Sequence, residues 1–128
     1  MNVLDESVPN DQRIQLTRWR VHTRKIGVDV GYLGILDENI MPLLHQLTRP
    51  TFFSRDKDFY KPTLRHADYC LVWLDAASHE TALYIRRLLG HPAFNTEAKR
   101  LGHVIHVTAN GVHYWRLRVA SEQSSAWL

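Results

Sequence analysis

The segment between Asp68 and Asp75 constrains the fold more than any other part of the sequence. Every residue from Tyr69 to Leu74 is apolar, including Trp73, which we expect in the core. A strand with one wet face alternates apolar and polar residues, whereas a strand that is apolar throughout is buried on both faces. The chain must therefore supply layers that cover both sides of a sheet.

Other segments predict strands and helices that alternate along the chain. Apolar segments predict strands at residues 2–4, 20–23 and 51–54, and the turn signal Asn110-Gly111 predicts a hairpin of residues 103–107 and 112–118. Helices are predicted after a cap at Asn10 or Asp11, from Asn39 to Leu47, and over residues 79–89 after a cap at Ser78. Proline is tolerated only in a first turn, so Pro42 favours Asn39 as the cap of the second helix.

This order predicts the α/β class, as a three-layer α/β/α sandwich around a mostly parallel sheet with a C-terminal β-hairpin. We expect a single domain over residues 1–120 and a short C-terminal tail over 121–128. The one cysteine excludes a disulfide framework. No apolar run approaches the ~18 residues of a membrane span, and the acidic start does not resemble a secretory signal. We therefore expect a cytoplasmic protein without a membrane partner.

Pairs of acidic residues lie next to the ends of two predicted strands and the start of one predicted helix. Three pairs stand out: Asp5 and Glu6 after the first strand, Asp37 and Glu38 ahead of the second helix, and Asp56 and Asp58 after residues 51–54. In parallel sheets, sites form outside the carboxyl ends of the strands. Carboxylates gathered there would raise one another's pKa, and Mg²⁺ or Mn²⁺ would relieve that repulsion. Such an ion can activate a water against a phosphodiester, so the pattern predicts metal-assisted phosphodiester hydrolysis.

Basic residues surround two of these acids. They are Arg49, Arg55, Lys57, Lys61 and Arg65, and residues 13–25 add five more with no acid among them. Basic groups near a metal centre suit a polyanionic substrate, and Trp19, Phe59 and Tyr60 could stack on unpaired bases. The run 13–25 is also compatible with an ordinary solvated face. Eight histidines form neither C-x-x-C nor H-E-x-x-H patterns, and His66 is the one most worth testing.

Three segments resemble a small PIN-like (PilT N-terminus) family. Residues 5–9 look like its D-E-N-x-P opening, with Ser7 in place of Asn, and residues 34–40 are similar to its G-x-x-D-E-E-I helix start. Residues 54–59 read S-R-D-K-D-F and match its T-R-D-K-D-F signature, with Ser54 in place of Thr. The order and spacing of these blocks cover residues 1 to about 118.

The resemblance implies an α/β/α nuclease domain that binds Mg²⁺ or Mn²⁺ and cuts RNA. Many small members are toxins held inactive by an antitoxin. Carried over by motif, the catalytic residues would be Asp5, Asp37, Asp56 and Asp58, with Glu6 and Glu38 as further metal ligands. Ser54, Arg55 and Lys57 would contact the substrate.

Other interpretations of the same residues stay open. Asp37 is equally suited to cap a helix, Asp56 and Asp58 could form a solvated turn, and Arg55 could pair with a carboxylate. The domain could instead be catalytically silent and bind RNA or a protein. It could also form a homodimer through the hairpin, with His106, Val112, Tyr114 and Trp115 lining one self-complementary surface.

Overall fold

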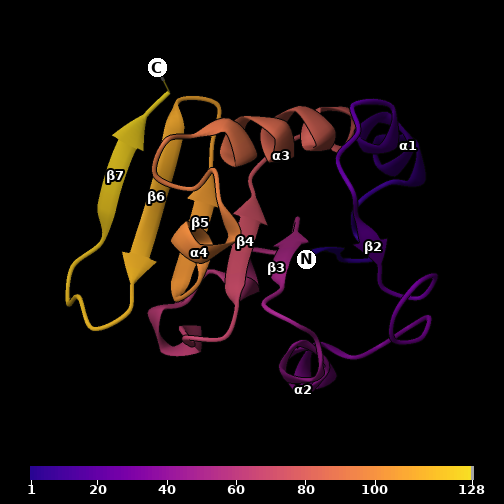
Figure 1. Cartoon of the computed structure of the whole chain (residues 1–128), viewed down its shortest axis with the longest axis horizontal. Coiled ribbons are helices and arrows are strands. Elements are labelled where there is room, and N and C mark those ends of the chain that lie inside the picture. Colours follow the sequence, from indigo (N-terminus) through magenta and orange to yellow (C-terminus); the bar gives the residue numbers. More distant parts are fainter. Residues whose placement is uncertain (128) are drawn as a thin grey trace.

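The computed structural model describes residues 1–127 and shows a mixed α/β fold built on one seven-stranded sheet (Figure 1). The strands are β1 (Asn2–Leu4), β2 (Arg24–Lys25), β3 (Thr51–Ser54), β4 (Cys70–Leu74), β5 (His103–Val107), β6 (Gly111–Arg116) and β7 (Gln123–Ala126). Their spatial order is β2-β1-β3-β4-β5-β6-β7. Neighbours from β2 to β5 are parallel, and β6 and β7 join antiparallel. The predicted mostly parallel sheet is confirmed.

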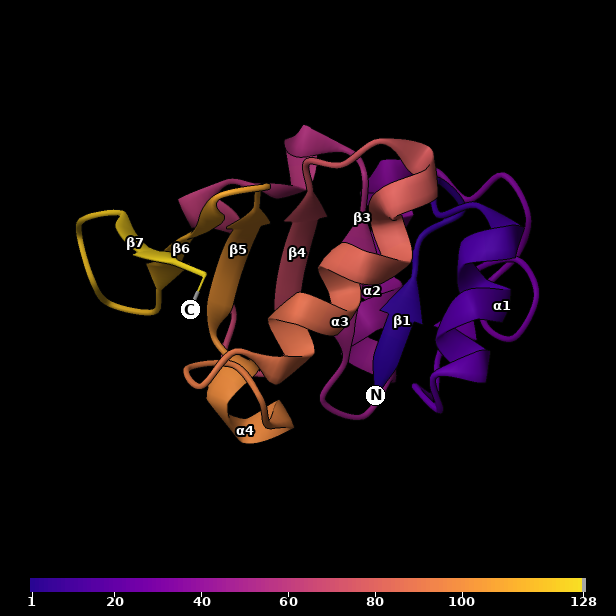
Figure 2. The same cartoon turned by 90° about the horizontal axis from the view of Figure 1, so that it is seen from above.

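Helices cover both faces of this sheet. They are α1 (Asn10–Arg18), α2 (Asp37–Gln46), α3 (Thr81–Gly90) and α4 (Glu97–Arg100), with single 3₁₀ turns η1 (Lys57–Phe59), η2 (Pro62–Leu64) and η3 (Ser78–Glu80). Figure 2 shows α3 in front of the sheet and α2 behind it, while α1 packs beside α3. The fold therefore has the three layers that the apolar strand requires.

Strand β4 is buried from both sides, as its sequence predicts. Val72 and Leu74 lie in the core under α1 and α3, and Leu71 lies in the core under α2. Trp73 differs from the prediction, because its side chain is partly exposed at the carboxyl end of the strand. Its ring stacks on His106 of β5, with ring centroids 3.8 Å apart. The apolar run predicts the strand correctly, but it does not show that the layer covering the strand leaves Trp73 partly exposed.

The helix starts differ from their predicted positions. Helix α2 begins at Asp37 after Leu36, so Asn39 is not the cap, and Pro42 lies beyond the first turn. Pro42 and Glu38 are both exposed, so the Glu38 carbonyl, which loses its usual amide donor, lies on the solvent side of the helix. In α1 the cap position is Pro9, and no side chain caps the helix. The second strand lies at Arg24–Lys25 rather than over residues 20–23.

The C-terminal region is more ordered than predicted. The hairpin of β5 and β6 is confirmed, but residues 123–126 form β7 against β6 instead of a tail. A Cβ atom at Gly111 would collide with the carbonyl oxygen of Ser125, so only glycine allows this close approach. Position 128 of the expected tail lies outside the described residues.

The four hairpin residues that could have lined a homodimer surface lie on two different faces of the sheet. Val112 is buried and Tyr114 packs on the core under α3. Trp115 pairs with Val104, whose side chain belongs to the core under α2, so Trp115 faces the opposite side of the sheet. The four residues therefore do not share one surface.

The sheet has a topological switch point between β1 and β3. The chain leaves β1 toward β2 on one side and returns to β3 on the other. Loops diverge there and leave a crevice beyond the carboxyl ends of the two strands. Within residues 1–127 no helix has the length and apolarity to cross a membrane.

Candidate metal centre at the carboxyl edge of the sheet

Three of the predicted site residues meet at the switch point. One carboxylate oxygen from each of Asp37, Asp56 and Asp58 lies within 4.8 Å of the other two. Asp37 comes from the first turn of α2, whereas Asp56 and Asp58 follow β3. The predicted convergence of acids that are far apart in sequence is therefore present for these three.

The turn after β3 fixes the positions of two of these acids. The Asp56 side chain accepts a hydrogen bond of 2.9 Å from the backbone N–H of Asp58 and so caps η1. This bond holds the two carboxyl groups on one side of a tight turn. The solvated-turn interpretation is right about the local geometry, but the turn also faces the start of α2. Asp37 does not cap α2 with its side chain, because the cap position is Leu36.

Asp5 is joined to this group through Ser54. The backbone N–H of Asp5 donates to the Phe53 carbonyl and keeps Asp5 beside the end of β3. The Ser54 hydroxyl donates to Asp5 Oδ2 at 2.7 Å and accepts from the Asp56 backbone N–H at 3.0 Å. One buried hydroxyl therefore links the loop after β1 to the loop after β3.

A second hydroxyl gives Asp5 another contact. Ser7 donates to Asp5 Oδ2 at 2.8 Å and accepts from the Arg55 backbone N–H at 3.1 Å. Ser7 thus supplies a linking hydrogen bond where the family pattern has Asn. Asp5 Oδ1 accepts from the Glu6 backbone N–H. With both oxygens engaged, Asp5 does not enter the group whose oxygens all lie within 4.8 Å.

Burial and the repulsion between these carboxylates change the pKa of Asp37. Burial raises the pKa of Asp37 above its ordinary value of 3.8, and the negative charges of Asp56, Asp5 and Asp58 raise this pKa further. Like charges about 4 Å apart repel by about 1 kcal/mol per pair in water-like surroundings. A divalent cation would convert this repulsion into attraction, and oxygen-only ligands with room for water suit Mg²⁺ or Mn²⁺. The donor set and the raised pKa of Asp37 both fit such an ion.

The two glutamates occupy different places around this centre. Glu6 Oε1 accepts a hydrogen bond of 2.8 Å from the backbone N–H of Gly34, so it anchors the loop ahead of α2. Glu38 lines a hollow of about 370 Å³ together with Asp37 and Asp58. Glu38 is therefore the nearer of the two to the open side of the cluster, and Glu6 acts on loop position.

The predicted substrate-binding residues divide in the same way. Ser54 is fully buried and its hydroxyl is occupied by Asp5 and Asp56, so its predicted substrate contact is replaced by a positioning role. Arg55 and Lys57 are exposed, and within residues 1–127 neither has a carboxylate partner. Lys61 lines the hollow beside Asp58. Three cations thus stand around the cluster with their charges available to an anion.

Other sequence candidates lie outside this arrangement. Arg13 pairs with Asp29, and the Lys25 ammonium donates to the Val8 carbonyl. Phe59 is buried against Phe52 and cannot stack on a base, so that prediction is wrong. The Trp19 ring is covered by the Arg86 guanidinium. These residues have structural contacts that the sequence pattern does not reveal.

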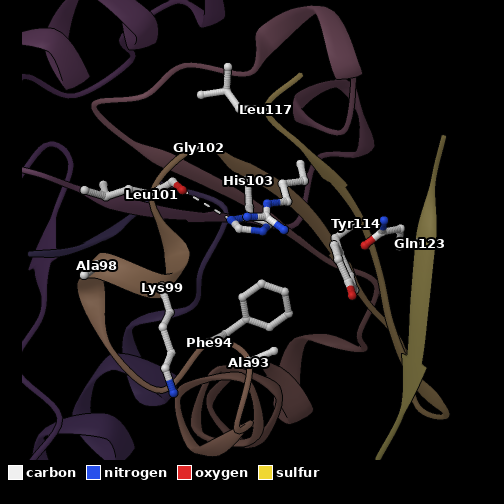
Figure 3. A pocket seen from close by; sticks show the side chains of 11 residues that line it. Ala93, Phe94, Ala98, Lys99, Leu101, Gly102, His103, Tyr114, Leu117 and Gln123 are labelled. Atoms are coloured by element: carbon white, nitrogen blue, oxygen red, sulfur yellow. Dashed lines mark hydrogen bonds between the residues drawn. The ribbon is translucent and has the colours of Figure 1, made fainter. Parts of the chain in front are cut away.

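A hollow of about 410 Å³ near the start of β5 is chemically unlike the acidic centre (Figure 3). In Figure 3, His103, Phe94 and Tyr114 line it, and Nδ1 of His103 contacts the Leu101 carbonyl. Lys99 and Arg116 contribute positive charge and no carboxylate lines it. Burial lowers the pKa of His103. The hollow therefore lacks the oxygen ligands found at the carboxyl edge.

Comparisons with known proteins do not extend this description. No family model, curated protein or solved structure matches the chain. The case for a function therefore rests on the residues and their arrangement.

Proposed function

We propose that the protein is a PIN-like, metal-dependent endoribonuclease that hydrolyses RNA phosphodiester bonds. The observation that carries the proposal is the meeting of Asp37, Asp56 and Asp58 at the switch point, with Asp5 tied to them through Ser54. The order of these acids along the chain follows the motifs that resemble the PIN-like family. The choice of RNA as the substrate follows the same resemblance.

In this proposal the chain holds the ion and orients the substrate. Asp37, Asp56 and Asp58 are the direct ligands, and Asp5 keeps the loops after β1 and β3 at a fixed spacing. Bound Mg²⁺ or Mn²⁺ supplies an activated water and stabilises the charge that develops on the scissile phosphate. Arg55, Lys57 and Lys61 hold the flanking phosphates by charge. Metal binding requires ionised carboxylates. Cleavage activity is therefore expected to fall as the pH is lowered toward the raised pKa of Asp37, because that carboxylate becomes protonated.

The first experiment compares RNA cleavage by the wild type and by Asp56→Asn in Mg²⁺ and in Mn²⁺. Asparagine keeps an acceptor oxygen for the Asp58 backbone N–H, so the turn is preserved while the charge is lost. We expect a loss of about 100-fold or more in cleavage rate. The exposed Asp11 in α1 provides the matched control, and Asp11→Asn is expected to cut at the wild-type rate. Equal cleavage by wild type and Asp56→Asn would reject the proposal.

A catalytically silent binding protein is the competing proposal, and the exposed cations favour it equally. Arg55 and Lys57 would then bind RNA without an ion. Such binding would persist in chelator, would fall steeply with salt and would leave the RNA uncut. Measuring binding and cleavage of one labelled RNA in the same buffers separates the two proposals.

We also propose that a protein partner, an antitoxin in the toxin interpretation, covers the loop ahead of α2. Val28, Tyr32, Leu33 and Leu36 are large apolar residues left exposed there, Leu33 to 75%. The bond from Gly34 to Glu6 places this loop beside the acidic centre. Co-expression with the product of an adjacent gene is expected to block cleavage, and Leu33→Asp is expected to restore it. Unchanged inhibition of Leu33→Asp would contradict this role for the loop.

A further inference from the structure

A second group of metal-ligating side chains lies at the amino edge of the sheet. His45 is in the last turn of α2, and His66 and Asp68 lie in the segment between η2 and β4. One ring nitrogen of each histidine and one carboxylate oxygen of Asp68 all lie within 4.8 Å of one another. This group shares no residue with the aspartate centre.

A buried ring holds the two histidines in place. Tyr69 is 5% exposed, and the His66 ring stacks on it with centroids 5.1 Å apart and an interplanar angle of 17°. His45 meets the edges of both rings, at 4.6 Å from His66 and 5.2 Å from Tyr69. Side chains fixed in this way lose less conformational entropy when they bind a ligand.

His66 Nδ1 and the Asp68 carboxylate are close neighbours at this site. The Asp68 backbone N–H donates to His66 Nδ1 at 3.1 Å, so Nδ1 is the ring nitrogen that carries the lone pair. The same Nδ1 lies 3.8 Å from Asp68 Oδ2. Neighbouring ligands around tetrahedral zinc are about 3.3 Å apart, given bonds of about 2.0 Å. A metal ion on Nδ1 would displace the Asp68 amide, which is exposed and can bond to water instead.

We propose that His45, His66 and Asp68 bind a divalent transition-metal ion such as Zn²⁺. Two imidazoles and one carboxylate suit zinc and its neighbours, whereas magnesium and calcium prefer oxygen ligands alone. Three protein ligands leave the fourth tetrahedral position to water. The ion joins the end of α2 to the segment that leads into β4, and so holds the helix that carries Asp37 at its other end.

Calorimetric titration of the full chain with Zn²⁺ and with Mn²⁺ tests the proposal. The aspartate centre offers carboxylates that Zn²⁺ also binds, so Asp56→Asn is the reference protein and is expected to bind one Zn²⁺. Adding His45→Gln or His66→Gln to Asp56→Asn is expected to weaken this binding at least tenfold. Asp11→Asn, an exposed acid outside both groups, is the matched control and is expected to leave Zn²⁺ binding unchanged. His22→Gln, an exposed histidine outside the group, is also expected to leave Zn²⁺ binding unchanged.

A thermal measurement separates binding from misfolding. Without metal the histidine variants are expected to melt close to the wild-type temperature, because His45 is exposed and His66 is only partly buried. Zn²⁺ at about 100 times its Kd is expected to raise the Tm of Asp56→Asn by about 5–10 °C and to leave the Tm of the double variant Asp56→Asn, His66→Gln unchanged. The proposal is overturned if Asp56→Asn binds no Zn²⁺, or if adding His45→Gln or His66→Gln leaves the Zn²⁺ affinity of Asp56→Asn unchanged. Neither result depends on RNA cleavage, so this proposal and the nuclease proposal fail separately.

Discussion

The two ends of α2 carry side chains of different chemistry, and the contrast shows how this fold builds sites. At the first turn, Asp37 meets two further carboxylates, and at the last turn His45 meets His66 and Asp68. In the first group the Ser54 hydroxyl binds the backbone of Asp56 and the carboxylate of Asp5, whereas the second group is supported by ring packing on Tyr69.

The difference in support matches a difference in role. A hydrogen-bonded framework fixes distances to the tolerance that catalysis needs. Ring packing positions imidazoles but leaves them at the surface, which suits an ion that stabilises the structure. In the proposed function the carboxyl edge is the reactive end of the molecule, and in the proposal of a second metal site the amino edge is where an ion holds the end of α2. The following predictions test that division, from the largest effect to the smallest.

Metal exchange separates the two edges most strongly. Chelation with EDTA is expected to abolish RNA cleavage, and Mg²⁺ or Mn²⁺ added in excess is expected to restore it fully, because a centre made of carboxylate oxygens alone suits these ions. Cleavage by His66→Gln is expected to recover in the same way as that of the wild type. The assignment of different roles to the two edges would be wrong if RNA cleavage returned only with Zn²⁺ and only with His45 and His66 intact.

Removing the Ser54 hydroxyl is expected to have the next largest effect. Ser54→Ala leaves Asp5 Oδ2 and the Asp56 backbone N–H each without this partner, so we expect cleavage to fall about 10–100-fold. The free energy of unfolding should drop by about 1–3 kcal/mol, because the site is buried. Urea denaturation and cleavage assays measure the two quantities, and Ser124→Ala on exposed β7 serves as the control. If Ser54→Ala cleaves RNA at the wild-type rate, the hydrogen bond from Ser54 to Asp5 is not needed for activity.

Arg55 and Lys57 are expected to contribute a moderate, salt-dependent part of RNA affinity. Each charge removed should reduce the slope of log K against log salt by about 0.7, the value for single strands. Arg55→Gln with Lys57→Gln should therefore weaken binding mainly at low salt while the free energy of unfolding stays within about 0.5 kcal/mol of the wild type. Fluorescence anisotropy at several salt concentrations measures this slope. An unchanged slope would place the RNA elsewhere on the surface.

The smallest expected effect is on stability and comes from Asp37. A carboxyl whose pKa is raised in the folded state destabilises that state once it ionises, so Asp37→Asn should raise the Tm of the metal-free protein at pH 7 by about 2 °C. The gain should vanish below pH 3.8, where the carboxyl is protonated in both states, and should also vanish in Mn²⁺. A lower Tm for Asp37→Asn at pH 7 would mean that the charge stabilises the start of α2 more than its neighbours repel it.

Local patterns in the sequence were sufficient to predict most of the fold. The apolar run of β4 and the hairpin of β5 and β6 depend on neighbouring residues alone, and both are confirmed. The chain turns one residue earlier than the Asn110-Gly111 signal indicates, because Gly111 already belongs to β6. Strand β7 was missed because its segment, Gln123–Ala126, is polar, and only its pairing with β6 makes it a strand. Pro42 misled the prediction of the α2 start, because an exposed carbonyl tolerates the lost hydrogen bond.

The candidate site was predicted in part for similar reasons. The sequence indicates that Asp56 and Asp58 follow a strand, whereas the strand order that brings the start of α2 and Asp37 beside them is seen only in the structure. The positioning role of Ser54 depends on a pair of hydrogen bonds across β1 and β3 that no pattern encodes. His66 was the histidine singled out, but its partner His45 lies in another element, and no sequence spacing links the two.

Anomalous diffraction from crystals of the wild type soaked in Mn²⁺ tests the central claim most directly. The account predicts a manganese peak bounded by carboxylate oxygens of Asp37, Asp56 and Asp58 at about 2.1 Å, and no such peak in Asp56→Asn crystals. Saturating Mn²⁺ with no peak among these three aspartates would contradict it.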